Sequence, residues 1–273
     1  GHAGDRYVKE KDYEGLKELL LRTEKASRRT GIPWGIDLNV STTIGEGAFE
    51  LIDFVGDYDV PLFLHVEPAN DFDTYREILD HVSITGLNSK VVVNSWHDGL
   101  HRLEKIYLAE MDPSAVLVLA PNPIPGSLEE KLDTIKKNVE DVKDYGMKKI
   151  MVDPAAVPLN AFLPTLEAIS LKEKVKYPFV IGAHNAMDGW SGKKKIPKSL
   201  RDMYSRELTR RAVLAGYDAV LAGPLNPRLI MESFPAYVEL GGYAHERYGY
   251  HLDENHPFNR DPAEVFKDYD EIL

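Results

Sequence analysis

The chain alternates between segments with helical periodicity and short apolar runs. The first amphipathic segment runs from Lys11 to Thr30, where leucines recur at helical spacing among charged residues, and Gly31-Ile32-Pro33 ends it. Short β-rich runs follow, each leading into a further amphipathic segment. The pattern predicts strands at Trp34 to Val40, Pro61 to Val66, Lys90 to Asn94, Ala115 to Ala120, Lys149 to Val152, Tyr177 to Ile181 and Asp218 to Leu221.

The segments between these strands carry helix start and stop signals. Ser127 is a predicted N-cap with glutamates in the first turn behind it, and Gly146 is the matching stop. Ser41-Thr42-Thr43 supplies cap candidates for the helix that follows the first strand. The predicted helices are Gly45 to Val55, Asp71 to Val82, Leu100 to Met111, Ser127 to Gly146, Leu159 to Leu171, Ser199 to Ala215 and Arg228 to Arg247.

Strands that are almost wholly apolar, each followed by a helix, predict a parallel sheet covered on both faces. At 273 residues the α/β class and a TIM (β/α)8 barrel fit the pattern. Seven strands are predicted where a barrel needs eight, so the first strand is expected upstream of Gly1, unless Arg6-Tyr7-Val8 contributes a short one. An open doubly wound sheet is the alternative. We expect one domain over residues 1–273, with the polar stretch 250–273 as a C-terminal arm on the barrel or on a neighbouring subunit.

Composition and net charge limit the kinds of molecule that the protein is expected to bind. The formal net charge of −11 disfavours a nucleic-acid or anionic-membrane surface, because both need clustered lysine and arginine. The absence of cysteine excludes disulfides, thiolate nucleophiles and thiolate metal sites. No apolar run is long enough to suggest membrane insertion. The expectation is a cytoplasmic protein that binds neither nucleic acid nor membrane.

Polar side chains gather where the predicted strands end. In a βα barrel the carboxyl ends of the strands open into one bowl, so residues far apart in sequence converge there. Amides and carboxylates dominate this set, which suits a planar heterocycle with many N–H donors. The residues are Asp37, Asn39, His65, Glu67, Asn94, Ser95, Asn122, Asp153, His184, Asn185 and Asn226.

Several of these residues also fit plain structural roles. Asp37 and Asn94 are of the types that cap helices, and Asp153-Pro154 is a common turn opening. His184 fits an ordinary loop histidine. A metal site is disfavoured, because the paired His-x-His ligands of zinc hydrolase barrels do not occur. Dinucleotide, phosphate-loop and nucleophile-elbow motifs are also missing from the sequence. Spacing alone indicates an α/β enzyme with an amide- and carboxylate-rich site.

Taken together, several segments carry a family resemblance. Their order and spacing resemble the H subunit of tetrahydromethanopterin S-methyltransferase and related pterin-binding methyltransferases, which look like relatives of dihydropteroate synthase with a TIM barrel. The similarity spans nearly the whole chain. The segments are the stretch from Leu21 to Ile36 continuing into Asp37-Leu38, Ser41-Thr42, Ile52-Asp53-Phe54-Val55, Val93-Asn94-Ser95, Met151-Val152-Asp153, Gly182-Ala183-His184-Asn185-Ala186 with Trp190, and Gly223-Pro224.

The resemblance implies a function. It places Asp37 and Asn94 in a pterin pocket, makes Asp153 the acceptor for pterin amino and ring N–H groups, and puts Asn185 near the methyl-bearing N5. The implied reaction moves that methyl group from a tetrahydropterin, such as tetrahydromethanopterin or tetrahydrofolate, to the cobalt of a corrinoid on a partner protein. A homodimer is also implied. Asn185 is the predicted catalytic residue.

The chain departs from the family pattern at two places. His65 stands where the family's strand usually ends in an Ile-Asp-Ser type sequence, so a pterin-binding carboxylate is replaced, and Glu67 projects to the same side as a substitute. Leu225-Asn226-Pro227 follows Gly223-Pro224 in place of an acidic residue. Two other functions therefore stay open: a non-catalytic pterin-binding or scaffold subunit, and a barrel enzyme acting on another small heterocycle or methylated amine.

Overall fold

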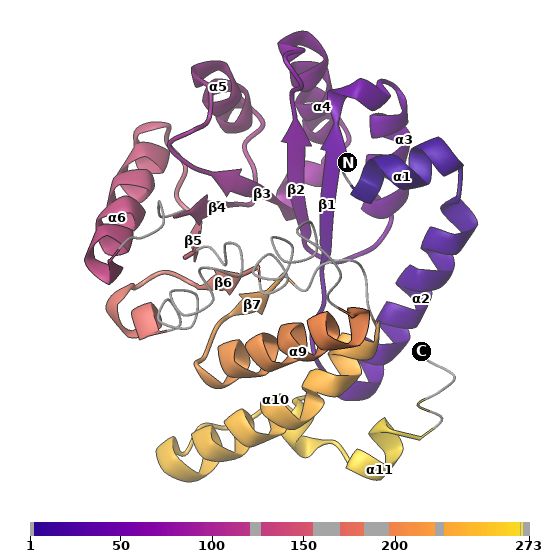
Figure 1. The fold of residues 1–273 in the computed structure, drawn as a ribbon, viewed down its shortest axis with the longest axis vertical. Coiled ribbons are helices and arrows are strands. Elements are labelled where there is room, and N and C mark those ends of the chain that lie inside the picture. Colours follow the sequence, from indigo (N-terminus) through magenta and orange to yellow (C-terminus); the bar gives the residue numbers. More distant parts are fainter. Residues whose placement is uncertain are drawn as a thin grey trace. The chain divides into compact units, whose positions relative to one another are not determined.

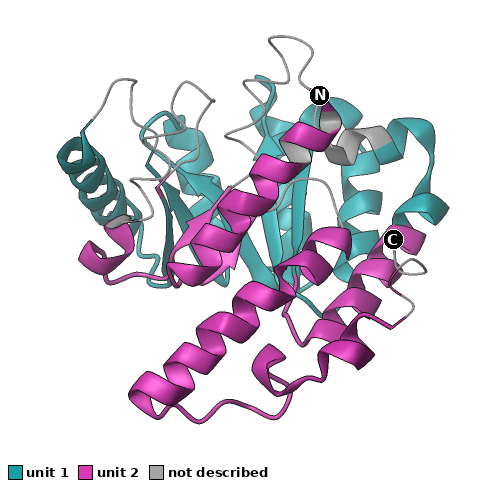
Figure 2. Cartoon of the chain, turned by 60° about the horizontal axis from the view of Figure 1, so that its bottom comes forward, with its two compact units in different colours: residues 1–16, 35–153 teal, residues 17–34, 154–273 magenta. Residues whose placement is uncertain are grey.

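The chain folds into two compact units. The computed structural model describes residues 3–120, 127–154, 170–182, 197–221, 227–267 and 269. Unit 1 comprises residues 1–16 and 35–153, and unit 2 comprises residues 17–34 and 154–273 (Figure 2). This division into compact units does not test the expectation of a single domain with a C-terminal arm, which stays a prediction.

Unit 1 is built on a parallel sheet (Figure 1). Every neighbouring pair of its strands is parallel, and the order in the sheet follows the sequence. Each predicted strand of this unit is confirmed to within two residues at either end. The strands are β1 (Ile36–Ser41), β2 (Leu62–Glu67), β3 (Val91–Trp96), β4 (Ala115–Leu119) and β5 (Ile150–Asp153).

Helices connect these strands, and side-chain caps set several of their starts. The Ser127 side chain accepts from the Glu130 amide and the Glu130 carboxylate accepts from the Ser127 amide, so the predicted cap is confirmed as a capping box. The Asp71 side chain caps the helix after β2 by accepting from the Thr74 amide. The helices are α1 (Ala3–Glu10), α3 (Gly47–Gly56), α4 (Phe72–Ile84), α5 (Arg102–Glu110) and α6 (Leu128–Asp144), with 3-10 turns η1 (Thr42–Ile44) and η2 (Leu87–Lys90).

Alternate residues of the strands form the apolar core of unit 1. Leu38, Leu64 and Val93 lie side by side in register and are at most 5% exposed. The helices supply the facing layer through residues such as Ile78 and Val142. Burying each side chain of this kind stabilises the fold by roughly 1.5–3 kcal/mol. These residues form the core on one face of the sheet, and the other face carries polar residues beside the buried Phe63 and Leu117.

Two local predictions are wrong. Arg6-Tyr7-Val8 is not a strand, because α1 covers this segment and Val8 packs closely against Gly47 at the start of α3. Ser41 does not cap the helix after β1. Its side chain accepts from the Thr43 amide and so caps η1, while α3 begins without a side-chain cap. Packing against α3 favours a helix at Arg6-Tyr7-Val8. The short turn η1 separates Ser41 from the start of α3.

Unit 2 contains the parallel strand pair β6 (Val180–Ile181) and β7 (Ala219–Val220), both at predicted positions. Its core joins α2 (Tyr13–Thr30), most of which lies in this unit, to the end of the chain, since Ala26, Phe234 and Val265 pack in one cluster. The predicted helix from Leu159 lies almost wholly outside the described residues. The remaining elements are η4 (Ser170–Lys174), α9 (Lys198–Leu214), α10 (Pro227–Tyr248), η5 (Pro257–Asn259) and α11 (Pro262–Val265).

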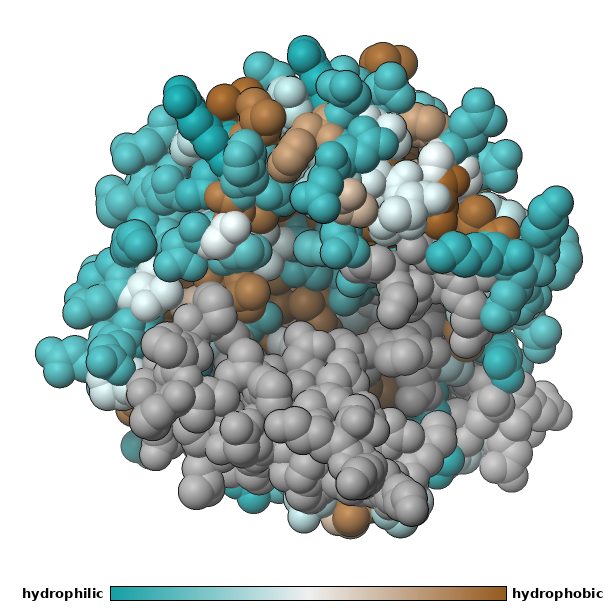
Figure 3. Space-filling view, turned by 45° about the horizontal axis from the view of Figure 1, so that its top comes forward, coloured by the Kyte–Doolittle hydropathy of each residue, from teal (hydrophilic) through white to brown (hydrophobic). Residues whose placement is uncertain are grey.

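Among the residues coloured on the face shown in Figure 3, hydrophilic side chains predominate, and apolar side chains form small groups between them. Within the described ranges, none of the helices combines the length and the apolar character needed to cross a membrane.

Candidate functional site

The register of unit 1 places the predicted pterin-binding residues on one face of the sheet. Asn39 pairs with His65, Leu64 pairs with Val93, and Leu119 pairs with Asp153. Paired residues in a parallel sheet project to the same side, and the side alternates along each strand. The shared face, opposite the side of Leu38, Leu64 and Val93, therefore carries Asp37, His65, Glu67, Asn94 and Asp153.

Hydrogen bonds link three strands of this face. The Asn94 amide Nδ2 donates to Asp37 Oδ1 at 2.9 Å, which joins β3 to β1 across the intervening β2. His65 Nδ1 lies 2.8 Å from the backbone oxygen of Asn94. Because a carbonyl oxygen only accepts, Nδ1 carries the proton in this contact, and the lone pair of a neutral ring is then on Nε2. Asp37 lies near the start of β1, whereas His65 and Asn94 lie toward the carboxyl ends of β2 and β3; we call the three residues the strand-end network.

His97 follows β3 and extends this polar region. Its Nδ1 accepts from the Gly99 amide at 3.1 Å. Burial lowers the pKa of His97, and the neighbouring His65 lowers it further, while Asp98 and Glu104 act in the opposite direction. The folded protein therefore favours the uncharged imidazole at this position.

Asp153 forms the other end of the polar face. It is the last residue of β5, is only 4% exposed, and its backbone oxygen accepts from the Ala120 amide at 2.9 Å. Lys131 on α6 is also buried, at 3% exposed. Burial lowers the pKa of the Lys131 amine, and the nearby Asp153 carboxylate partly offsets this effect. The sequence motifs did not point to Lys131.

Asp37 and Asn94 do not have the helix-capping role that their residue types also fit. Neither Asp37 nor Asn94 caps a helix, since both lie within strands and His101 caps α5. Glu67 ends β2 and is exposed. The predicted catalytic Asn185 lies outside the described residues, as do His184, Asn122 and Asn226.

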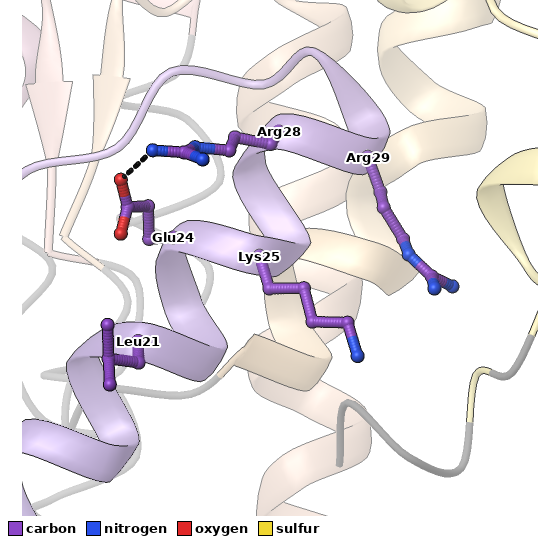
Figure 4. A pocket seen from close by; sticks show the side chains of 5 residues that line it. All are labelled: Leu21, Glu24, Lys25, Arg28 and Arg29. Carbon is purple, nitrogen blue, oxygen red and sulfur yellow. Dashed lines mark hydrogen bonds and ion pairs between the residues drawn. The ribbon is translucent and has the colours of Figure 1, made fainter.

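A metal centre or a surface hollow would be an alternative to the polar face as a functional site. Among the residues that the structure describes, no group of three or more His, Cys, Asp or Glu side chains is arranged to hold a metal. A surface hollow along α2 in unit 2 is lined by Leu21, Glu24, Lys25, Arg28 and Arg29 (Figure 4). There the Arg28 guanidinium turns toward Glu24 and pairs with it at 2.6 Å, but the Arg28 side chain is 78% exposed. Exposed pairs of this kind contribute little, and the hollow lacks converging buried polar groups.

The polar face of unit 1 suits a ligand rich in N–H donors. Asp37 and Asp153 supply carboxylate oxygens, and the Asn94 side chain is oriented by its bond to Asp37. An ionised carboxylate accepts two N–H bonds side by side, as an amino group and a ring N–H of a heterocycle would provide. The face can therefore orient such a ring.

Solved structures with a similar fold identify the fold class of this chain. Dihydropteroate synthase from Yersinia pestis, determined with a sulfonamide drug, matches with a TM-score of 0.62 at 11% identity, covering 86% of this chain and 87% of that one. The Coxiella burnetii enzyme, determined with pteroic acid, matches with a TM-score of 0.56 at 13% identity, covering 85% and 86%. The α/β, TIM-barrel class predicted from the sequence is confirmed by this likeness.

The family follows from the sequence match. Residues 8–244 match the family described as the tetrahydromethanopterin S-methyltransferase MtrH subunit, and the chain belongs to this family. The corresponding subunit from Methanopyrus kandleri is 24% identical over 218 residues, covering 74% of this chain and 66% of the relative. The one from Methanothermobacter marburgensis is 28% identical over 270 residues, covering 90% and 83%. The predicted resemblance is confirmed.

Proposed function

We propose that this chain is a methyltransferase that takes the methyl group from N5 of a methylated tetrahydropterin. The observation that carries the proposal is the strand-end network, in which Asn94 holds Asp37 on the same face as Asp153. Family membership supports it, because the relatives are named as subunits of tetrahydromethanopterin S-methyltransferase. Under this proposal Asp153 accepts from the amino-pyrimidinone edge of the pterin, and Asp37 and Asn94 line the pocket.

The chemistry of the leaving group supports a catalytic amide. When the C–N bond breaks, N5 keeps the bonding electron pair and needs a proton or a strong hydrogen bond, since an unprotonated amine is a poor leaving group. A positioned donor that acts more strongly in the transition state than in the ground state lowers the barrier. We assign this role to Asn185 on the basis of the sequence resemblance. Its position in the segment after β6 lies outside the described residues.

The methyl acceptor is proposed to be the cobalt of a corrinoid carried by a partner protein. The acceptor supplies the electron pair that forms the new bond to carbon, so this chain has to bind and orient the donor and to stabilise the departing N5. The chain is also proposed to form a homodimer in the cytoplasm. Light scattering that gives a monomer mass would remove the dimer from the proposal without touching the chemistry.

Two assays test the function. Calorimetric titration with 5-methyl-tetrahydromethanopterin and 5-methyl-tetrahydrofolate measures binding, and absorbance spectroscopy of free cob(I)alamin mixed with protein and donor measures transfer. We expect binding by the native chain and transfer that falls at least tenfold in Asn185→Ala with binding retained. Binding without transfer to any cob(I)amide would favour a non-catalytic pterin-binding subunit. Absence of binding to every reduced pterin would overturn the proposal.

A further inference from the structure

A lysine lies on the buried side of α6. The helix buries a stripe of residues at helical spacing, and its members are Lys131, Ile135, Asn138, Val139 and Val142. Lysine is rarely buried in proteins unless another group compensates its charge. Lys131 is nevertheless only 3% exposed, so a compensating group is expected nearby.

The geometry of α6 places Lys131 at the same end of the sheet as the candidate site. Further along the stripe, Asn138 Nδ2 donates to the backbone oxygen of Leu119 at 3.0 Å, which fixes that point of α6 at the carboxyl end of β4. Lys131 precedes Asn138 by seven residues, or about 10 Å of helix. Because a helix that follows a parallel strand runs back along it, Lys131 lies toward the strand ends, where the polar face opens.

Asp153 is the charged group whose influence on Lys131 the structure shows. It ends β5, next to β4 in the sheet, and Leu119 and Asp153 pair in register. Its carboxylate favours the protonated Lys131 amine, against the larger effect of burial that lowers the pKa of Lys131. Electrostatic interaction is reciprocal, so the Lys131 ammonium favours the ionised form of Asp153 by the same free energy.

We propose that Lys131 is a positioning residue of the candidate site, whose buried ammonium group keeps Asp153 ionised and oriented to accept hydrogen bonds from the substrate. The substrate part of this proposal rests on the proposed function. Asp153 is itself buried, and burial favours the protonated carboxylic acid, which accepts fewer N–H bonds and presents a donor to the ring. A cation supplied by the helix that precedes β5 counters that tendency.

The test separates charge coupling from a merely structural role. In the ligand-free protein, carbon-13 NMR follows the Asp153 carboxyl carbon with pH, and Asp153→Asn identifies its signal. Removing the cation in Lys131→Met should move the Asp153 midpoint upward by about one pH unit, whereas Lys131→Arg should leave it near the native value. Lys137→Met is the matched control, because Lys137 lies on the same helix with its side chain 70% exposed. It should leave the midpoint unchanged.

Binding of 5-methyl-tetrahydropterin gives the second readout. Lys131→Met should weaken binding by up to about tenfold at pH values below the Asp153 midpoint, with recovery as pH rises through the shifted midpoint. A structural role alone would weaken binding equally at every pH. If Lys131→Met does not fold, Lys131→Gln gives the same uncharged test with a polar side chain. An unchanged Asp153 midpoint in the uncharged variant would overturn the inference. The NMR measurement needs no pterin, so it decides this point even if no pterin binds and the proposed function fails.

Discussion

The side-chain amide of Asn94 on β3 donates a hydrogen bond of 2.9 Å to the carboxylate of Asp37 on β1. Two residues separated by 57 positions in the sequence thus meet across β2. The bond fixes which end of the Asn94 amide is the donor and holds Asp37 in place. A ligand that enters this face meets groups that are already oriented.

Asn94→Ala should weaken binding of 5-methyl-tetrahydropterin by about 10- to 100-fold, because hydrogen bonds to charged groups contribute roughly 1.5–3 kcal/mol. Isothermal calorimetry checks this value. Asn88→Ala is the matched control: its amide also donates across the fold, to the Asp112 backbone oxygen at 3.2 Å, but it precedes β3 at the opposite end of the strand. Equal losses of affinity in both variants would show that Asn94 acts only through general stability.

A partly buried network around Trp96 makes a separate prediction about stability. Trp96 Nε1 and Lys105 Nζ both donate to Asp141 Oδ2 at 2.7 Å, and the indole is fully buried. Asp141→Ala removes the acceptor of the Trp96 indole N–H and the anion beside Lys105, so the free energy of unfolding should fall by about 1–3 kcal/mol. Urea denaturation measures the change.

The control for this network lies on the same helix. Asp133 pairs with Lys136 at 3.1 Å, with the two side chains 69% and 73% exposed. Asp133→Ala should therefore change the free energy of unfolding by less than about 0.5 kcal/mol. Similar losses for Asp133→Ala and Asp141→Ala would contradict the assigned network.

A substitution at Gly31 in unit 2 tests how closely the backbone around Asn255 packs against the turn that follows α2. Gly31 has a φ of +74°, and an added Cβ would lie 2.1 Å from the Asn255 backbone oxygen. Gly31→Ala combines left-handed strain with a backbone clash, so it should lower the free energy of unfolding by more than about 2 kcal/mol. Gly86 has a φ of +75° with open space around it, so Gly86→Ala isolates the strain alone. The difference in melting temperature between the two variants reports the clash, and equal melting temperatures would exclude it.

The lowered pKa of His97 predicts a pH dependence of stability. Burial makes the folded-state pKa lower than the unfolded value of about 6.5, so the unfolded chain binds more protons as pH falls. The contribution of His97 is fully present above the unfolded pKa and is lost as pH falls toward the folded pKa. Native protein should therefore lose more stability between about pH 7 and pH 5 than His97→Gln does. Parallel urea titrations at the two pH values check the sign, and an equal or larger loss in His97→Gln would refute it.

The sequence pattern predicted the βα alternation because periodicity and turn residues act locally. The strand positions in unit 1 and the Ser127 cap follow from such local signals. The barrel pattern also predicted that polar residues distant in sequence converge, as the bond between Asp37 and Asn94 shows. The contact of His65 with the Asn94 backbone could not be predicted, because no side-chain pattern encodes a bond from Nδ1 to a backbone oxygen on the next strand.

Lys131 is a second feature of the candidate site that the sequence pattern could not predict. Glu129, Glu130 and Asp133 lie close to it in the sequence and indicate a solvated position, whereas the buried stripe of α6 places it inside. Only the packing of α6 over the carboxyl end of β4 brings it near Asp153. Similarly, Arg6-Tyr7-Val8 formed a helix because packing against α3 and β1 favoured that conformation over a strand. The roles of Asn185 and His184 stay predictions.

The most direct test of the central claim is calorimetric titration of the native chain and of Asp153→Asn with 5-methyl-tetrahydropterins. The substitution keeps the side chain's size but replaces one acceptor oxygen by a donor, so the amino-pyrimidinone edge meets a mismatched group. We expect saturable binding of one pterin per chain and an affinity at least tenfold weaker in Asp153→Asn. Equal affinity in the two proteins, or no binding by the native chain to any reduced pterin, would contradict the claim.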